Sequence, residues 1–201
     1  MNLIIFGPPG AGKGTQSKYI ANRFNLHQLS TGDLLRNEIK NKTELGLKIS
    51  SIINSGGLVS DDIVGNLIEK FVSNDLYKNK IIFDGYPRTL SQAQSLDLLL
   101  KNYDQKVDFV LKLSVSLQTI KKRISERQAQ EKRSDDSEEI AIKRFETYEQ
   151  STKPILEYYK KHNLIKEVNG EQKIEEINKE IGDIIELIEA WFWTITLYKY
   201  A

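Results

Sequence analysis

Short apolar runs alternate with longer amphipathic stretches along this chain. Residues 3–6, 81–83 and 107–113 are runs with few polar interruptions, and residues 164–168 form a weaker one. Such runs are typical of strands that are buried on both faces, whereas the stretches between them show helical spacing. The alternation predicts an α/β fold, with a mostly parallel sheet that is covered by helices on both sides.

Two segments interrupt this alternation. Residues 30–59 predict a helical insert, because Ser30 with Asp33 three positions later is typical of a helix start, and a glycine pair marks the exit. A second and much smaller insert is the polar stretch 128–134. Near the C-terminus, the isoleucines of residues 174–188 recur at helical spacing and predict a helix that packs on the sheet.

The C-terminal tail, residues 190–201, contains both tryptophans of the chain. Trp193, Ile195 and Leu197 alternate with threonines, which is a strand period rather than a helical one. An accessory strand, an extension of the preceding helix, a self-association patch and a frayed end are all compatible with this pattern.

Composition narrows the classes of function. With 201 residues and 39% hydrophobic content, the chain suits one ordinary domain with a substantial core. Its 29 Lys and Arg against 28 Asp and Glu give a formal net charge of +1, so there is no global basic field for nucleic acid or a membrane. The chain contains no cysteine, which excludes disulfides and thiolate metal sites, so no zinc is expected. The lack of cysteine also agrees with a reducing cytoplasm. The apolar start leaves no room for a cleavable signal, and every apolar run is shorter than the ~20 residues of a spanning helix.

A glycine-rich loop follows the first predicted strand. Residues 7–15 read GPPGAGKGT and lead into a helical stretch at 16–24. Glycines let backbone N–H groups point at a phosphate, the helix offers its positive N-terminal end, and Lys13 reaches the terminal phosphates. The usual pattern has Ser or Thr directly after the lysine, but here Gly14 intervenes and Thr15 supplies the hydroxyl that could face Mg²⁺. The strand before and the helix after the loop favour phosphate binding over a turn that binds nothing.

Charged residues gather after the strand ends. Asp84 closes the strand at residues 81–83, where phosphate-loop enzymes carry an acid on the Mg²⁺ side, although an acid that caps a turn would look the same. Arg88 follows at the same edge of the sheet and can reach the same ligand. Arg123 and Arg127 are four positions apart and share one helix face.

Arg144 lies within the apolar stripe of its helix, where an arginine rarely stands without an anion. Asp135 could supply that anion, and a substrate phosphate is the other candidate. Arg133 and Arg144 would flank the small polar insert as cationic anchors. His27 and His162 fall in no motif, and a nucleotide phosphate that is already ionised needs alignment and charge neutralisation rather than a general base.

Taken together, these segments resemble the adenylate kinase family. The motifs that carry the resemblance are GPPGAGKGTQ, LSTGDLLR, GGLVSDDIV and DGYPRTLSQA, and the similarity covers about residues 2–188. It implies a P-loop NTPase-type three-layer α/β/α fold with a five-stranded parallel sheet. Only five residues separate Arg127 from Arg133, as in the short-lid members of the family. The implied division is a core of 1–29, 60–126 and 137–201, an AMP-binding insert at 30–59 and a short lid at 127–136.

The resemblance also implies roles for individual residues. ATP would be bound by Gly10, Ala11, Gly12, Lys13, Gly14, Thr15, Arg123, Arg127 and Gln172. AMP would be bound by Thr31, Arg36, Gly57, Leu58, Val59, Gly85, Tyr86, Pro87, Arg88, Gln92, Arg133 and Arg144. The catalytic set would be Lys13, Asp84, Arg88, Arg123, Arg133 and Arg144, with Asp135 and Asp136 in the lid hinge. Mg²⁺ would be held through nucleotide phosphates and water, with Thr15 and Asp84 nearby.

The activity implied is reversible phosphoryl transfer from Mg·ATP to AMP, giving two ADP, by a cytoplasmic monomer. The nearest alternative is a UMP/CMP kinase, which has the same phosphate loop and also a short lid. That relative typically has alanine in place of Thr31 and asparagine in place of Thr89, so Thr31, Thr89 and Gln92 favour adenine as the acceptor base. A non-catalytic nucleotide-binding switch is the third alternative, and the presence of Lys13 and the spaced arginines argues against it.

Overall fold

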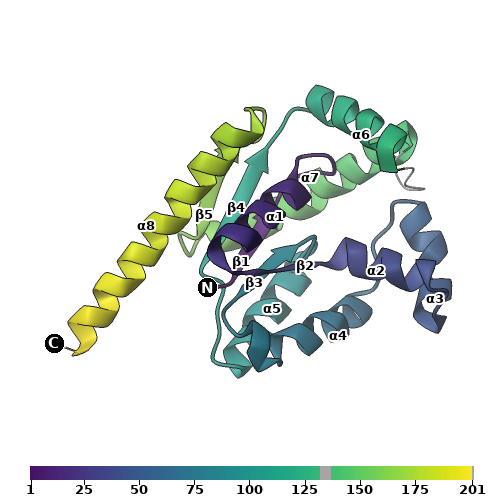
Figure 1. The fold of residues 1–201 in the computed structure, drawn as a ribbon. Coiled ribbons are helices and arrows are strands. Elements are labelled where there is room, and N and C mark those ends of the chain that lie inside the picture. The colour runs from purple at the N-terminus through teal and green to yellow at the C-terminus, as the bar shows by residue number, and fades with distance from the viewer. Residues whose placement is uncertain (132–136, 201) are drawn as a thin grey trace.

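A five-stranded parallel sheet forms the centre of the computed structural model, which describes residues 1–131 and 137–200 (Figure 1). The strands lie side by side in the order β2-β3-β1-β4-β5, and every neighbouring pair is parallel. Their bounds are β1 Leu3–Phe6, β2 His27–Ser30, β3 Ile81–Asp84, β4 Phe109–Ser114 and β5 Ile165–Asn169. The predicted α/β class with a parallel sheet is confirmed.

Helices connect the strands and cover both faces of the sheet. They are α1 Lys13–Phe24, α2 Thr31–Lys40, α3 Glu44–Asn54, α4 Asp61–Val72, α5 Leu90–Asn102, α6 Leu117–Glu131, α7 Glu138–Lys160 and α8 Ile174–Tyr200, with a short 3-10 turn η1 Asp75–Tyr77. On one face, Ile20 of α1 and Ile181 of α8 pack against strand residues such as Ile5. On the other face, Leu96 of α5 and Tyr159 of α7 belong to a second buried cluster. The sheet between two helical layers is the predicted three-layer α/β/α arrangement.

Four of the strands lie where the apolar runs predicted them, and the fifth, β2, was not indicated by the pattern. The burial of β2 explains this difference, because only Leu29 among its four residues is buried. As an edge strand, β2 has a sheet neighbour, β3, on one side only. A short strand at that position can fold with polar residues that give no apolar run.

Helices α2 and α3 project beyond the sheet, next to the ends of β2 and β3 (Figure 1). The predicted helix start is confirmed, because the Ser30 hydroxyl accepts the N–H of Asp33 at 3.3 Å. The two helices pack closely at Gly46, where a Cβ would stand 2.1 Å from the carbonyl oxygen of Glu38. The pair is therefore a compact helical unit at the carboxyl edge of the sheet.

Helix α8 is longer than the helix predicted at 174–188, and of the alternatives left open for the tail the structure shows the extension of that helix. The helix continues to Tyr200 instead of ending near residue 188 (Figure 1). Extending an existing helix gains one hydrogen bond for each residue that is fixed, whereas an isolated strand would need a partner strand. Ile177, Ile181 and Ile185 are buried as predicted, but Ile174 is 54% exposed. Among the described helices, none combines the length and apolar content that crossing a bilayer requires.

The small polar insert expected at 128–134 is only partly described. Helix α6 continues through its first residues to Glu131. Arg133, Asp135 and Asp136 lie outside the described residues, so the expectations that concern them stay predictions. The next described helix, α7, begins at Glu138 after Ser137, whose hydroxyl accepts the N–H of Ile140 at 3.4 Å.

Candidate active site

The loop between β1 and α1 brings a lysine to the carboxyl edge of the sheet. Gly12 precedes the helix with φ 96°, a left-handed conformation that suits glycine. The Lys13 Nζ donates to the carbonyl oxygens of Gly7 at 2.6 Å and Pro8 at 3.1 Å, so its side chain folds back over the loop. Gly14 and Thr15 are exposed in the first turn of α1. The N–H groups at the start of this helix are suited to bind an anion.

The charge of Lys13 is strongly influenced by its surroundings. Burial lowers the pKa of its ammonium to about 8, the carboxylate of Asp84 opposes that change, and the positive charges of Arg88, Arg144 and Arg127 lower the pKa further. These groups come from the end of β3, from the loop after it, from α7 and from α6. Four positive side chains therefore act on one another near a single carboxylate, which favours a multiply charged anion between them.

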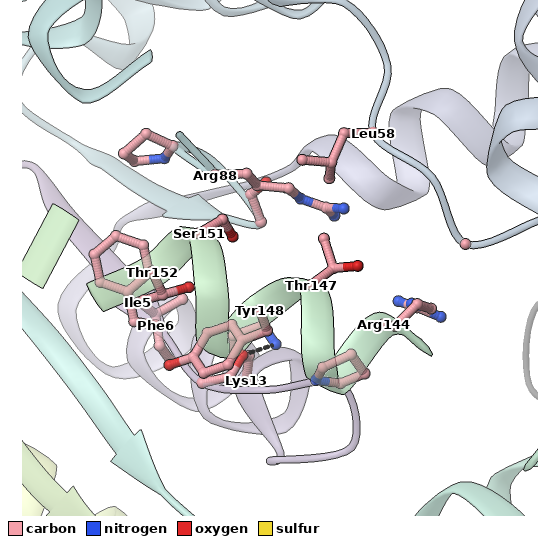
Figure 2. A pocket seen from close by; sticks show the side chains of 15 residues that line it. Ile5, Phe6, Lys13, Leu58, Arg88, Arg144, Thr147, Tyr148, Ser151 and Thr152 are labelled. Carbon is pink, nitrogen blue, oxygen red and sulfur yellow. Dashed lines mark hydrogen bonds between the residues drawn. The ribbon is translucent and has the colours of Figure 1, made fainter. Parts of the chain in front are cut away.

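A cleft joins the lysine to two of the arginines. Lys13, Arg88 and Arg144 line it together with Gly7 and Pro9 of the phosphate loop. Figure 2 shows the three charged side chains around the cleft, each on a different element. Gly56 and Leu58, from the segment between α3 and α4, complete the wall. The aliphatic part of Arg144 is close to Gly56, where a Cβ would stand 3.0 Å from its Cγ.

Helix α7 contributes a row of side chains to the cleft that the sequence interpretation did not assign to the site. Thr147, Tyr148, Ser151 and Thr152 line the cleft beside Arg144 (Figure 2). Burial raises the pKa of the Tyr148 hydroxyl. The signal was present in the sequence, because these residues follow Arg144 at helical spacing on one face of the helix.

A second pocket adjoins the cleft and is lined mainly by predicted AMP-binding residues. Its walls are Thr31, Leu35, Ile53, Gly57, Leu58, Val59, Val64, Gly85, Arg88 and Gln92. Leu58, Gly85 and Arg88 line both the pocket and the cleft. A ligand that occupies the pocket can therefore extend past Arg88 into the space that Lys13 lines.

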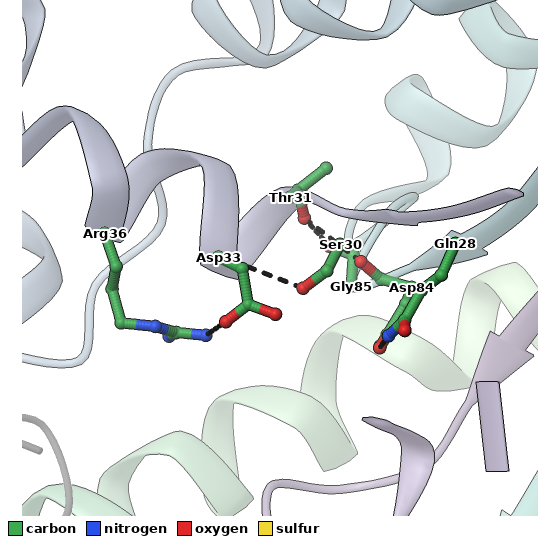
Figure 3. Close-up of polar contacts among 7 residues, drawn as sticks. All are labelled: Gln28, Ser30, Thr31, Asp33, Arg36, Asp84 and Gly85. Atoms are coloured by element: carbon green, nitrogen blue, oxygen red, sulfur yellow. Dashed lines mark hydrogen bonds and ion pairs between the residues drawn. The ribbon is translucent and has the colours of Figure 1, made fainter. Parts of the chain in front are cut away.

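The turn after β3 shapes the wall between the pocket and the cleft. The Thr31 hydroxyl donates to the carbonyl oxygen of Gly85 at 3.0 Å (Figure 3). Gly85 has φ 81°, and a Cβ on it would stand 2.9 Å from that hydroxyl oxygen. The Arg88 Nε donates to the same carbonyl at 2.7 Å, which holds the guanidinium over the turn. Tyr86 is buried, and Pro87 lines the cleft.

Asp84 lies near enough to Lys13 for its charge to act on the lysine, whereas Arg36 lies outside both the pocket and the cleft. Asp84 is only 7% exposed and accepts a hydrogen bond from the Gln28 Nε2 at 2.9 Å on one carboxylate oxygen. The Arg36 guanidinium instead pairs with Asp33 at 2.6 Å and lines neither the pocket nor the cleft (Figure 3). Its predicted contact with a nucleotide would require the side chain to leave Asp33.

Arg123 of α6 also holds the phosphate loop in place. Its guanidinium donates to the carbonyl oxygens of Gly170 at 2.8 Å and Ala11 at 3.3 Å. Gly170 follows β5 and packs close to the loop, and Gln172 is exposed in the same turn. Arg123 therefore ties the phosphate loop to the turn where the adenine of the donor was predicted.

Two further residues at the site were missed from the sequence. Gln28 orients the Asp84 carboxylate, as described above. Asp61, the first residue of α4, accepts a hydrogen bond from the Gln92 Nε2 at 2.7 Å. Asp61 belongs to the GGLVSDDIV motif, but neither that motif nor the sequence around Gln28 indicates these contacts, because each one joins elements that are distant in the sequence.

The parallel sheet, the phosphate loop at the start of α1, and an adjoining second pocket define a phosphate-loop kinase of the nucleoside monophosphate class. The sequence model of the family described as Adenylate kinase matches residues 5–164. Relatives described as adenylate kinases include those of Pelagibacter ubique (41% identical, 93% of this chain and 100% of the relative), Caulobacter sp. strain K31 (41%, 94% and 100%) and Bifidobacterium longum (41%, 90% and 97%). This chain belongs to the adenylate kinase family and is a phosphotransferase with adenylate kinase activity.

Proposed function

We propose that this chain transfers a phosphoryl group reversibly from Mg·ATP to AMP, forming two ADP, and so maintains the balance of adenine nucleotides. The observation that carries the proposal is the shared wall of the two pockets. Arg88 borders both the cleft that Lys13 lines and the pocket that contains Thr31 and Gln92. Two nucleotides bound in these spaces would direct their phosphates toward each other.

The donor nucleotide is assigned to the phosphate-loop side. Its phosphates lie on the backbone of Gly10, Ala11, Gly12, Lys13, Gly14 and Thr15, with Arg123 and Arg127 at their edge. The adenine lies against the turn at Gln172. The hydrogen bonds of Arg123 to Ala11 and Gly170 support this assignment, since they hold loop and turn together.

The acceptor is assigned to the second pocket. Thr31, Gly57, Leu58, Val59, Gly85, Tyr86, Pro87 and Gln92 surround AMP, and Arg36 and Arg88 meet its phosphate. Arg36 turns from Asp33 to the phosphate when AMP binds, which exchanges one exposed ion pair for a charge-assisted hydrogen bond to a doubly charged group. The lining of the pocket supports this assignment for the residues it includes.

The transfer itself needs charge neutralisation and alignment. Lys13, Arg88, Arg123, Arg133 and Arg144 offset the charge that spreads over the moving phosphoryl group, and no general base is required because the attacking AMP oxygen is already ionised. The row of α7 side chains beside Arg144 lines the cleft and limits the access of water, which would compete as an acceptor.

The residues at the loop fit Mg²⁺, which prefers oxygen ligands and keeps several waters. The Asp84 carboxylate is buried beside Lys13, its Oδ2 accepts from Gln28, and the exposed Thr15 lies in the first turn of α1. Asp84 and Thr15 would face the ion through water or directly, while nucleotide oxygens supply the other ligands. The cation would offset phosphate charge and keep the two nucleotides aligned.

The proposed division of the chain follows the sequence prediction. The core comprises 1–29, 60–126 and 137–201, the acceptor-binding insert 30–59, and the short lid 127–136. The projection of α2 and α3 beyond the sheet supports the insert (Figure 1). We further propose that the protein acts as a cytoplasmic monomer whose partners are ATP, AMP and ADP.

Steady-state rates with ATP, Mg²⁺ and each of AMP, CMP, UMP and GMP test the proposal. We expect AMP to be the preferred acceptor by kcat/KM. The Lys13→Ala variant should lose at least about 100-fold in kcat, because removing one preorganised donor from a transfer site costs about that much. A preference for CMP or UMP would identify the alternative UMP/CMP kinase, and full activity of Lys13→Ala would contradict the role of the lysine.

A further inference from the structure

The amide of Gln92 is held at both of its ends. Gln92 is 3% exposed at the wall of the second pocket. Its Oε1 accepts the backbone N–H of Arg88 at 2.7 Å, and its Nε2 donates to the Oδ1 of Asp61 at 2.7 Å. A backbone N–H can only donate and a carboxylate can only accept, so the positions of the amide oxygen and nitrogen are both determined by their partners.

Asp61 is itself fixed from α5. Its second oxygen, Oδ2, accepts from the Ser91 hydroxyl at 2.6 Å and from the Thr89 hydroxyl at 3.4 Å. Thr89 also caps α5 by accepting the N–H of Gln92 at 3.1 Å. The carboxylate therefore joins the first turn of α4 to the first turn of α5, and it cannot rotate away from Gln92 without losing several hydrogen bonds.

An amide that cannot turn presents a fixed order of donor and acceptor. After its two internal bonds, Gln92 retains one N–H and one oxygen lone pair for a ligand. Adenine offers a ring-nitrogen acceptor beside an amino donor, whereas guanine and uracil offer a ring N–H donor beside a carbonyl acceptor. A rotating amide could match either edge, but a fixed amide matches only one of them. Reversing Gln92 would place its oxygen against the Asp61 carboxylate and its NH₂ group against the N–H of Arg88.

We propose that Asp61 is a specificity-determining positioning residue, whose carboxylate holds the Gln92 amide in the orientation that accepts adenine and rejects bases with the opposite edge. This inference rests on the proposed function, since it concerns the acceptor pocket of that reaction. Asp61 acts through Gln92 and does not itself contact the nucleotide.

The test is the Asp61→Asn variant, in which the asparagine amide can present either an oxygen or an NH₂ group to Gln92. We expect the ratio of kcat/KM for AMP to that for GMP to fall about tenfold, through a higher KM for AMP and a measurable rate with GMP, while KM for ATP is unchanged. The change stays partial because the backbone N–H of Arg88 still favours the original orientation.

The matched control is Asp62→Asn. Asp62 is the next acid in the first turn of α4 and is exposed, so the change removes the same charge from the same helix end without reaching Gln92. We expect its AMP to GMP ratio to equal that of the wild type. Thermal unfolding of both variants verifies that they are folded at the assay temperature.

Equilibrium binding separates this inference from the proposed function. The dissociation constants of AMP and GMP are measured by calorimetry for the wild type and both variants, without turnover. An Asp61→Asn variant with the wild-type ratio, or with equal losses for the two nucleotides, would overturn the inference. A wild type that binds AMP selectively but does not phosphorylate it would overturn the proposed function alone.

Discussion

The protonation of Lys13 should be linked to nucleotide binding. Burial lowers the pKa of its ammonium to about 8, and three arginine charges add to the effect. Nucleotide phosphates would place negative charge beside the lysine and raise that pKa toward its ordinary range. At pH 8, about half of the lysines are neutral before binding and nearly all are charged afterwards. ATP binding at pH 8 should therefore take up about 0.5 proton from the solvent.

The sign of the pH dependence follows from the same shift. Well below pH 8 the lysine is charged in both states, so the affinity for ATP does not depend on its titration there. As the pH rises through about 8, the nucleotide-free lysine loses its proton, and ATP affinity should fall until the bound lysine also begins to titrate. The phosphates of ATP contribute little to proton uptake near pH 8, because the last proton of a terminal phosphate has a pKa of about 6.

Calorimetric titration with ATP in buffers of different ionisation enthalpy measures the proton uptake directly. Lys13→Met should abolish most of the uptake at pH 8, with ATP raised to allow for weaker binding. Lys18→Met, which removes an exposed lysine from the same helix, should retain it. An uptake below about 0.1 proton in the wild type, or equal uptake in wild type and Lys13→Met, would show that Lys13 does not gain a proton when ATP binds.

Three further substitutions test individual parts of the structure. Gly85→Ala should lower the free energy of unfolding by about 1–2 kcal/mol and raise KM for AMP, because φ is 81° and the new Cβ would meet Thr31. The control Gly65→Ala has open space at its Cβ and should not lower stability in urea denaturation. Arg123→Lys should raise KM for ATP about tenfold and leave KM for AMP nearly unchanged in steady-state assays, since one ammonium cannot span the two carbonyls that the guanidinium joins. Asn2→Ala should lower the free energy of unfolding in urea by about 2–4 kcal/mol, because Asn2 is fully buried and forms hydrogen bonds with Gln105, Lys106 and Ile81. Its kcat should stay within about twofold of wild type, because Asn2 lines neither the cleft nor the second pocket. A stable Asn2→Ala protein, an unchanged KM for ATP in Arg123→Lys, or equal unfolding curves for both glycine variants would each contradict the corresponding argument.

Features that are encoded locally could be predicted from the sequence. The phosphate loop, the Ser30 helix start and the strand ending at Asp84 each depend on a few consecutive residues, and the structure places all of them at one edge of the sheet. The predicted convergence of Lys13 with Arg88 and Arg144 agrees with the cleft they line.

Features that depend on tertiary packing could not be predicted in this way. β2 carries one buried residue and folds as a strand because β3 provides its hydrogen bonds. The pairing of Asp61 with Gln92 depends on the packing of α4 against α5, which no spacing within either helix expresses. The alternation in the tail left a strand and a helix extension both open, because the pattern contains no information about whether the preceding helix continues through it.

Two nucleotides should bind to this chain at once, with their phosphates facing each other across Lys13 and the arginines. Calorimetric titration with a bisubstrate ligand, two adenosines joined by five phosphates, measures this simultaneous binding. One molecule should bind per chain, with an affinity far above that of ATP or AMP, and both ATP and AMP binding should be lost in its presence. Displacement of only one of the two nucleotides, or an affinity no better than that of ATP alone, would contradict it.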